Sequence, residues 1–145
     1  MWSCYENPVF QQFYHPETGA ASGLKLNWFD LNGTTFRPGG TIGIEIQLEA
    51  VGPITEQFSV FVHLMDQDGM LVAQVDSPPK NGLYPTNQWQ LGEVEYDYHE
   101  LVLPEQLPVG EYLLILGIYD LESGARWRIN SDSTIELGQI LVSNA

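Results

Sequence analysis

Basic residues are scarce in this sequence. Five Lys and Arg residues stand against 19 Asp and Glu residues, so the formal net charge is −14 at pH 7. Nucleic-acid binding needs a basic surface that neutralises phosphates, and attraction to anionic lipid needs clustered Lys and Arg. The composition therefore argues against both kinds of partner. It is compatible with Ca²⁺ or with a basic protein partner.

Cysteine and long apolar runs are nearly absent as well. The single cysteine, Cys4, cannot form an internal disulfide, and this leaves the compartment open because many extracytoplasmic bacterial domains lack disulfides too. No apolar run approaches the ~18 residues of a membrane-spanning helix, so we expect no direct membrane insertion. The start of the chain lacks the basic and apolar regions of an intact signal peptide. We expect the chain to be compatible with a processed or excised piece of a longer protein, and the role of Cys4 stays open.

Helical periodicity is also missing, and alternation with a period of two takes its place. In Thr41–Glu49, four aliphatic residues fall on one face and polar residues on the other, which is typical of a half-buried strand. Short segments of this kind, separated by Gly, Pro, Asn and Asp turns, recur along the chain. We expect strands at residues 24–31, 41–49, 58–65, 70–75, 93–103, 111–119, 126–129 and 134–142.

Two of these segments, Phe58–Met65 and Glu111–Tyr119, are apolar on both faces, which is typical of central strands. The sequence therefore predicts an all-β fold, an immunoglobulin-like or carbohydrate-binding-module-like β-sandwich of two antiparallel sheets with about eight or nine strands. We expect one sandwich domain at residues 24–145. Residues 1–23 show no period and predict an irregular, aromatic-rich arm that packs on this domain or on a partner.

Two local features are informative. Val94, Tyr96 and Tyr98 share one phase while Leu101 and Leu103 take the other, which predicts a β-bulge near His99. The stretch 76–90 contains three prolines and reads as a long loop, and loops of that length are usually functional or self-packed.

The segments FSVFVHLMDQDGMLVAQVDSPP, GLYPTNQW, GEY, GIYD and ELGQILV form a recognisable combination. Between about Phe36 and Val142 the chain resembles a β-sandwich module found at the C-terminal end of bacterial, multi-spanning, dolichyl-phosphate-mannose-type glycosyltransferase-like proteins. The resemblance implies a sandwich domain outside the cytoplasm, in the periplasm or at the cell surface. The transferase activity belongs to the membrane portion of those proteins and does not transfer to this chain.

Aromatic residues around the long loop are the best candidates for a ligand site. Flat Trp and Tyr rings serve as platforms for sugar rings, and neighbouring amides bind hydroxyl groups. The candidate sugar platform consists of Tyr84, Trp89, Tyr96, Tyr98 and Asn87. For Trp89 the alternative is that its indole is buried in the core and anchors the loop.

The remaining candidates are weaker. Asp66 and Asp68 precede Gly69 as in the start of a calcium-binding loop, but the rest of that motif is missing, and a hairpin turn is the favoured explanation because Asp residues favour such turns on their own account. The three histidines lack zinc-ligand spacing, no nucleophile motif is present, and scattered carboxylates form no recognisable glycosidase pair. We therefore expect no enzyme activity and no cofactor, with calcium as an open possibility.

Two functions remain. The first is a non-catalytic binding or scaffolding module of the bacterial envelope that engages another protein or a membrane-protein assembly, with the arm 1–23 as a docking element. The second is a carbohydrate-binding module that uses the aromatic residues of the 76–98 region.

Overall fold

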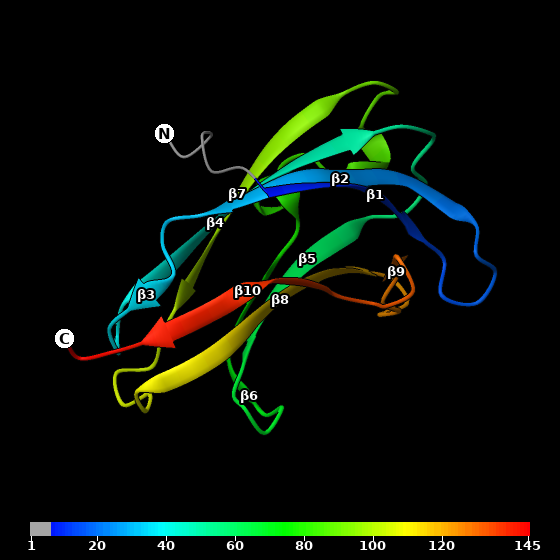
Figure 1. Cartoon of the computed structure of the whole chain (residues 1–145). Coiled ribbons are helices and arrows are strands. Elements are labelled where there is room, and N and C mark those ends of the chain that lie inside the picture. Colours follow the sequence, from blue (N-terminus) through cyan, green and yellow to red (C-terminus); the bar gives the residue numbers. More distant parts are fainter. Residues whose placement is uncertain (1–6) are drawn as a thin grey trace.

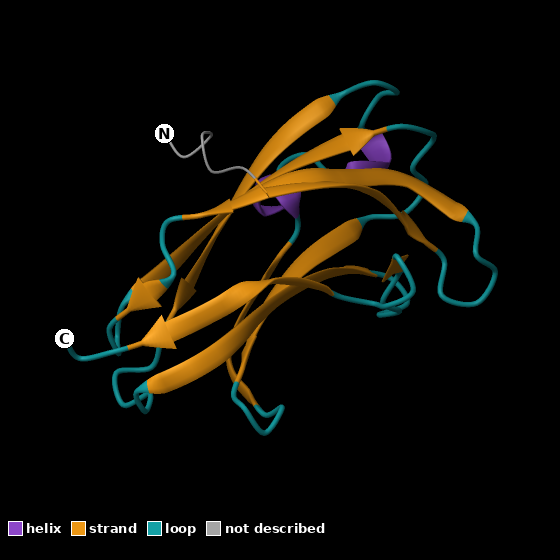
Figure 2. Cartoon of the chain, viewed as in Figure 1, coloured by secondary structure: helices purple, strands orange, loops and turns teal. Residues whose placement is uncertain are grey.

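The computed structural model describes residues 7–145 of the chain. Figures 1 and 2 show two layers of strands with little else. The strands are β1 (Asn7–Tyr14), β2 (Ala21–Leu31), β3 (Thr35–Phe36), β4 (Thr41–Ala50), β5 (Phe58–Met65), β6 (Leu71–Ser77), β7 (Val94–Val102), β8 (Gly110–Asp120), β9 (Arg128–Ile129) and β10 (Ile135–Val142). Two 3₁₀ turns, η2 (Pro79–Gly82) and η3 (Thr86–Gln88), lie in the long loop between β6 and β7.

The strands form two sheets, which confirms the predicted β-sandwich. The first sheet has the order β7-β4-β2-β1-β9 and the second has the order β3-β10-β8-β5-β6. All pairings are antiparallel except β3 with β10, which is parallel. Strands β5 and β8 are central in the second sheet, as their two apolar faces predict. No helix among residues 7–145 has the length and hydropathy needed to cross a membrane.

The core lies between the two sheets. Strand β4 contributes Ile42, Ile44, Ile46 and Leu48, which are all buried, while its polar residues point to the outer face. From the second sheet, the alternate residues Phe58, Val60, Val62 and Leu64 of β5 face them. This alternation buries one face of each strand and accounts for most of the hydrophobic stabilisation.

The prediction of an irregular arm at residues 1–23 is wrong for residues 7–23, the part of this region that the structure describes. Residues 7–14 form β1, which pairs with β2 and β9 inside the first sheet. The alternation is hidden in the sequence because β1 contains two register shifts and Phe10 adopts a positive φ of 52°. Phe13 is 0% exposed and belongs to the core. Cys4 lies outside the described residues.

The bulge expected near His99 is also wrong. Strands β4 and β7 pair in an unbroken register from Thr41 opposite Val102 to Glu49 opposite Val94. Asp97, His99 and Leu101 are buried on the inner face of β7, and Tyr96 and Tyr98 are exposed on the outer face. The phase does not change along the strand. Two polar residues, Asp97 and His99, can occupy buried positions on the inner face because they pair with each other.

Candidate functional site

Two rungs of side chains cross the outer face of the first sheet from β7 through β4 to β2. In one rung Tyr96 lies opposite Gln47, and Gln47 lies opposite Trp28. In the next rung Tyr98 lies opposite Glu45, and Glu45 lies opposite Asp30. Side chains directly opposite each other on paired strands share a face. We call this surface the platform, defined by Trp28, Asp30, Glu45, Gln47, Tyr96 and Tyr98.

Aromatic rings form one margin of the platform. Tyr96 is 54% exposed and Tyr98 is 48% exposed, although both lie on a strand of a packed sandwich. The rings of Tyr96 and Trp28 lie 6.0 Å apart and are tilted relative to each other. The pKa of the Tyr98 hydroxyl is raised by partial burial and by the carboxylates of Glu100 and Glu45. The Tyr98 hydroxyl therefore stays protonated at neutral pH and can donate a hydrogen bond.

Polar groups occupy the middle of the platform. The Asn27 side chain, which lies at a register shift of β2, donates hydrogen bonds to Gln47 Oε1 at 2.8 Å and to Glu49 Oε1 at 3.0 Å. Burial raises the pKa of the Asp30 carboxyl, and the Leu31 amide opposes this effect. The platform thus places amide and carboxyl groups beside exposed aromatic rings.

Two buried oxygen atoms on this face have no hydrogen-bond partner. They are Asn27 Oδ1 and Asp30 Oδ2, and no other buried side-chain oxygen or nitrogen atom in residues 7–145 is left unpaired. Such orphaned acceptors are rare in native proteins and cost free energy. Both come from β2 and flank Trp28 in the sequence. The platform therefore has a local excess of acceptors over donors.

The predicted aromatic cluster is divided between separate places. Tyr96 and Tyr98 lie on the platform. Trp89 is 7% exposed and packs in the core, where its Nε1 donates a 2.9 Å hydrogen bond to the Tyr84 carbonyl. The assignment of Trp89 to an exposed platform is therefore wrong, and its alternative role as a buried anchor is the observed one. Burial of the large indole ring supplies the reason.

Tyr84 and Asn87 also lie away from the platform. Tyr84 is half-buried beside Trp89, with ring centroids 6.0 Å apart, and its hydroxyl donates to Glu93 Oε1 at 2.7 Å. Asn87 lines an open, polar pocket of 540 Å³ together with residues of the loops before β5 and after β8. The structure therefore does not bring either residue to Tyr96 and Tyr98.

The candidate calcium residues belong to a hairpin turn. Asp66 Oδ1 accepts the backbone N–H groups of Asp68 and Met70, both at 2.9 Å, and Gly69 has the expected positive φ of 79°. This arrangement is an Asx turn that closes the hairpin between β5 and β6. Within the described part of the chain, His, Cys, Asp and Glu side chains form no group of three or more that could hold a metal ion.

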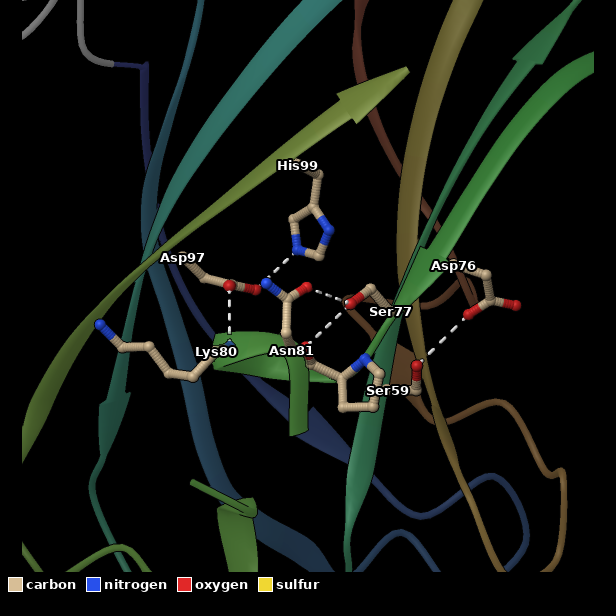
Figure 3. A network of polar contacts seen from close by, with 8 residues as sticks. Ser59, Asp76, Ser77, Lys80, Asn81, Asp97 and His99 are labelled. Carbon is tan, nitrogen blue, oxygen red and sulfur yellow. Dashed lines mark hydrogen bonds and ion pairs between the residues drawn. The ribbon is translucent and has the colours of Figure 1, made fainter. Parts of the chain in front are cut away.

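A buried pair on the inner face of β7 holds the long loop in place. His99 Nε2 and Asp97 Oδ2 lie 2.6 Å apart, and Asp97 Oδ1 accepts the Lys80 backbone N–H at 3.0 Å. Figure 3 shows this chain of contacts reaching from β7 into η2. Lys80 Nζ also lies 3.4 Å from Glu95 of the same strand. Lys80 and Asn81 have left-handed φ values of 58° and 55°, a conformation that persists only when the surrounding structure fixes it. We therefore infer that the hydrogen bond that Asp97 accepts from the Lys80 amide stabilises this turn.

The candidate residues predicted from the sequence did not include Trp28, Asn27, Asp30 or Gln47. The alternation in β4 did place Glu45 and Gln47 on the polar face of that strand. The neighbours in β2 and β7 could not be assigned to the same surface, because the strand order 7-4-2 is a property of the tertiary fold. The register shift at Asn27 also hides which side of β2 carries Trp28.

Comparison with known proteins shows the fold alone. No protein-family model matches the sequence, and no curated protein matches it. Among solved structures, the C-terminal domain of Wzt is similar with a TM-score of 0.63 and 13% identity, over 96% of this chain and 83% of that domain.

Two enzymes contain a similar domain. A β-glucuronidase of glycoside hydrolase family 2 matches with a TM-score of 0.52 and 11% identity, over 88% of this chain and 12% of the enzyme. A mutant β-glucosidase from Listeria innocua, in complex with laminaribiose, matches with a TM-score of 0.54 and 15% identity, over 87% of this chain and 17% of the enzyme. This chain therefore spans a small part of either enzyme.

Proposed function

We propose that this protein is a non-catalytic binding module and that its platform binds a neutral glycan. The observation that carries the proposal is the pair of exposed tyrosines, Tyr96 and Tyr98, beside the polar rungs of β4 and β2. Sugar rings present apolar C–H faces and a rim of hydroxyl groups. Exposed aromatic rings match the faces, and convergent amide and carboxyl groups match the rim.

The charge of the platform selects the class of glycan. Asp30, Glu45 and Glu49 lie on this face, and Lys25 is opposite Glu49 in the register. An acidic sugar would meet repulsion from these carboxyl groups, whereas hydroxyl groups of a neutral sugar donate to them.

Fold likeness is consistent with this proposal. The similar domains of the β-glucuronidase and the β-glucosidase belong to enzymes that act on sugars, and the platform itself is built from this chain's own residues. The resemblance to the glycosyltransferase-associated module, and with it a location outside the bacterial cytoplasm, belongs to the same proposal. A row of exposed rings along an edge strand, as Tyr96 and Tyr98 form, suits recognition of an extended chain better than chemistry.

The test is a screen of immobilised neutral glycans with the purified protein, followed by calorimetric titration of any hit. We expect Tyr96→Ala and Tyr98→Ala each to weaken binding by about tenfold or more, equivalent to about 1.4 kcal/mol. Val102→Ala is the matched control, because Val102 is exposed on the outer face of the same strand. Absence of any bound glycan, or equal loss in the control, would overturn the proposal.

A protein partner is the second candidate function, and one observation favours it. Strand β7 is a nine-residue edge strand with Val94 and Val102 exposed. An open edge offers backbone groups to an added strand. A photoreactive residue at position 102 should then crosslink to a membrane-assembly protein in the native host, whereas one at exposed Glu136 of β10 should not.

A further inference from the structure

A second pocket lies on the opposite side of the sandwich, on the outer face of the second sheet. It has a volume of 260 Å³ and is lined by Phe61, His63, Gln74, Asp76, Tyr119, Gly124 and Arg126. These residues come from β5, β6, β8 and the loop between β8 and β9. The pocket belongs to a different sheet from the platform, so the two surfaces are independent.

The floor of the pocket is the ring of Phe61. Phe61 lies directly opposite Gly117 in the register of β5 and β8. A Cβ atom at position 117 would meet Phe61 Cε2 at 2.6 Å, so glycine at this position lets the ring lie flat across β8. The ring is 2% exposed, although it points away from the core between the sheets. The side chains above it provide this cover.

The Arg126 guanidinium covers the Phe61 ring, with its central carbon 4.3 Å from the ring centroid. Stacking of this kind fixes the plane of the guanidinium and lowers the entropy lost when it binds a ligand. Within the described residues, no hydrogen bond or ion pair of this guanidinium is present. In contrast, Lys80 pairs with Glu95 and Arg128 donates to the Ser131 carbonyl.

The carboxylate of Asp76 faces the pocket but has other partners. Its Oδ1 accepts the Tyr119 hydroxyl at 2.9 Å and the Ser59 hydroxyl at 3.3 Å. The donor fork of Arg126 is therefore positioned by the ring beneath it and carries no protein carboxylate. A planar fork of this kind matches a carboxylate bidentately.

Other polar groups complete the wall. The His63 ring lies 4.8 Å from the Phe61 ring, and burial together with Arg126 lowers the pKa of His63 below its ordinary value. At neutral pH the imidazole is therefore neutral and offers one N–H donor. The Gln74 amide adds further donors at the rim.

We propose that this pocket binds the carboxylate of a single sugar ring, the chemistry of a uronic acid, with Arg126 holding the carboxylate. Ligand sites for drug-sized molecules span about 300–1,000 Å³, and this pocket is slightly smaller, which fits one ring. Gln74, His63 and Tyr119 also line the pocket and offer polar groups to the hydroxyl groups of a bound ring. The net charge of −14 repels anions at long range, so general electrostatic attraction would not hold one here.

The experiment is a titration of the isotope-labelled protein with glucuronate, followed by NMR of the His63 ring and of the backbone amides. Glucose supplies the same ring without the carboxylate, and acetate supplies the carboxylate without the ring. We expect saturable shifts that centre on His63 and Gln74 with glucuronate, and binding weaker by about tenfold or more with glucose and with acetate. A bound carboxylate should also raise the pKa of His63, because a negative charge favours the imidazolium.

Arg126→Gln is the decisive variant, and Arg128→Gln is its matched control because Arg128 lies two residues away and is exposed. We expect Arg126→Gln to weaken glucuronate binding by about tenfold or more, and Arg128→Gln to change it by less than about twofold. Arg126→Lys keeps the charge without the fork, and we expect intermediate affinity. Melting temperatures of all variants establish that each is folded.

Three results would overturn the proposal: no saturable shift with glucuronate, equal affinity for glucose or acetate, or unchanged binding in Arg126→Gln. Tyr96→Ala should leave glucuronate binding unchanged, because Tyr96 lies on the other sheet. Failure of this site is therefore distinguishable from failure of the platform.

Discussion

At the scale of single residues, Tyr84 shows how a loop is held by hydrogen bonds to its side chains. Its hydroxyl donates to Glu93, and this bond raises the pKa of Tyr84 from 10.0 to about 12. Because the folded pKa lies above the unfolded value, the stabilisation is fully present below about pH 10 and is lost as the pH rises through about 12. We expect the ultraviolet titration of the wild-type protein to differ from that of Tyr84→Phe by one tyrosine that ionises with a midpoint near pH 12.

Glu93→Gln tests the cause of this shift. The variant keeps a hydrogen-bond acceptor but removes the negative charge, so the pKa of Tyr84 should fall toward its ordinary value. A wild-type Tyr84 that titrates together with the exposed tyrosines would contradict the assignment.

Gly117 is a second residue whose identity is set by its neighbour. The added Cβ of Gly117→Ala would lie 2.6 Å from the Ser133 carbonyl oxygen as well as against the Phe61 ring. We expect a loss of about 1–3 kcal/mol in the free energy of unfolding, measured by urea denaturation, because overpacking forces side chains and backbone to move.

Gly33→Ala is the control for this prediction. Neither glycine has a positive φ, and the nearest atom to a Cβ at position 33 is Phe36 Cζ at an ordinary 3.6 Å. Equal effects of the two substitutions would mean that the loss of glycine flexibility, and not the contact with Phe61, determines the cost.

At the scale of elements, β1 is the most informative strand. Phe13 is 0% exposed whereas Phe10 of the same strand is 59% exposed. We expect Phe13→Ala to lower the free energy of unfolding by about 3–5 kcal/mol, because it leaves a cavity in the core. Phe10→Ala should change it by less than about 0.5 kcal/mol. Urea denaturation of both variants measures the difference.

The comparison also decides the role of the N-terminal region. If β1 belongs to the sandwich, a chain without residues 1–22 should lose most of its stability. A truncated chain with an unchanged melting temperature, or Phe13→Ala with no cost, would restore the independent arm expected from the sequence.

Strand β7 explains why element-level prediction fails where polar residues are buried. The alternation of the strand is regular, but the inner face begins with Asp97 and His99 and the outer face carries Tyr96 and Tyr98. A prediction from hydrophobicity alone places the two tyrosines in the core. It therefore assigns the inner and outer faces of the first half of β7 the wrong way round. The pairing of Asp97 with His99 satisfies both groups, which makes their burial affordable.

At the scale of the whole molecule, the excess of negative charge acts on stability. With a net charge of −14, repulsion among carboxylates opposes the compact state. We expect the melting temperature at pH 7 to rise by several degrees when salt increases from about 0.01 M to about 0.15 M, because the Debye length falls from about 30 Å to about 8 Å. Differential scanning calorimetry measures the shift.

Sucrose at matched osmolality is the control, since it stabilises proteins without screening charge. A melting temperature that stays constant or falls with salt would show that the carboxylates are compensated locally. At the Arg126 pocket, the guanidinium lies over the Phe61 ring and forms no ion pair with a carboxylate of the described residues.

The sequence by itself determined the architecture. Apolar residues at every second position, separated by turn-forming residues, can bury their side chains only by facing another sheet, and the strands between residues 24 and 142 follow from that pattern. Asp66 with Gly69 and the polar face of Thr41–Glu49 were assigned correctly for the same local reason.

Only the tertiary structure decided which surfaces carry the chemistry. The platform joins residues of β2, β4 and β7, and the second pocket joins β5, β6, β8 and the following loop. Neighbours in a sheet depend on strand order and register, which long-range packing selects. Trp89 and Tyr96 are equally aromatic in the sequence, but one is buried and the other exposed because the loop between β6 and β7 folds back over the core.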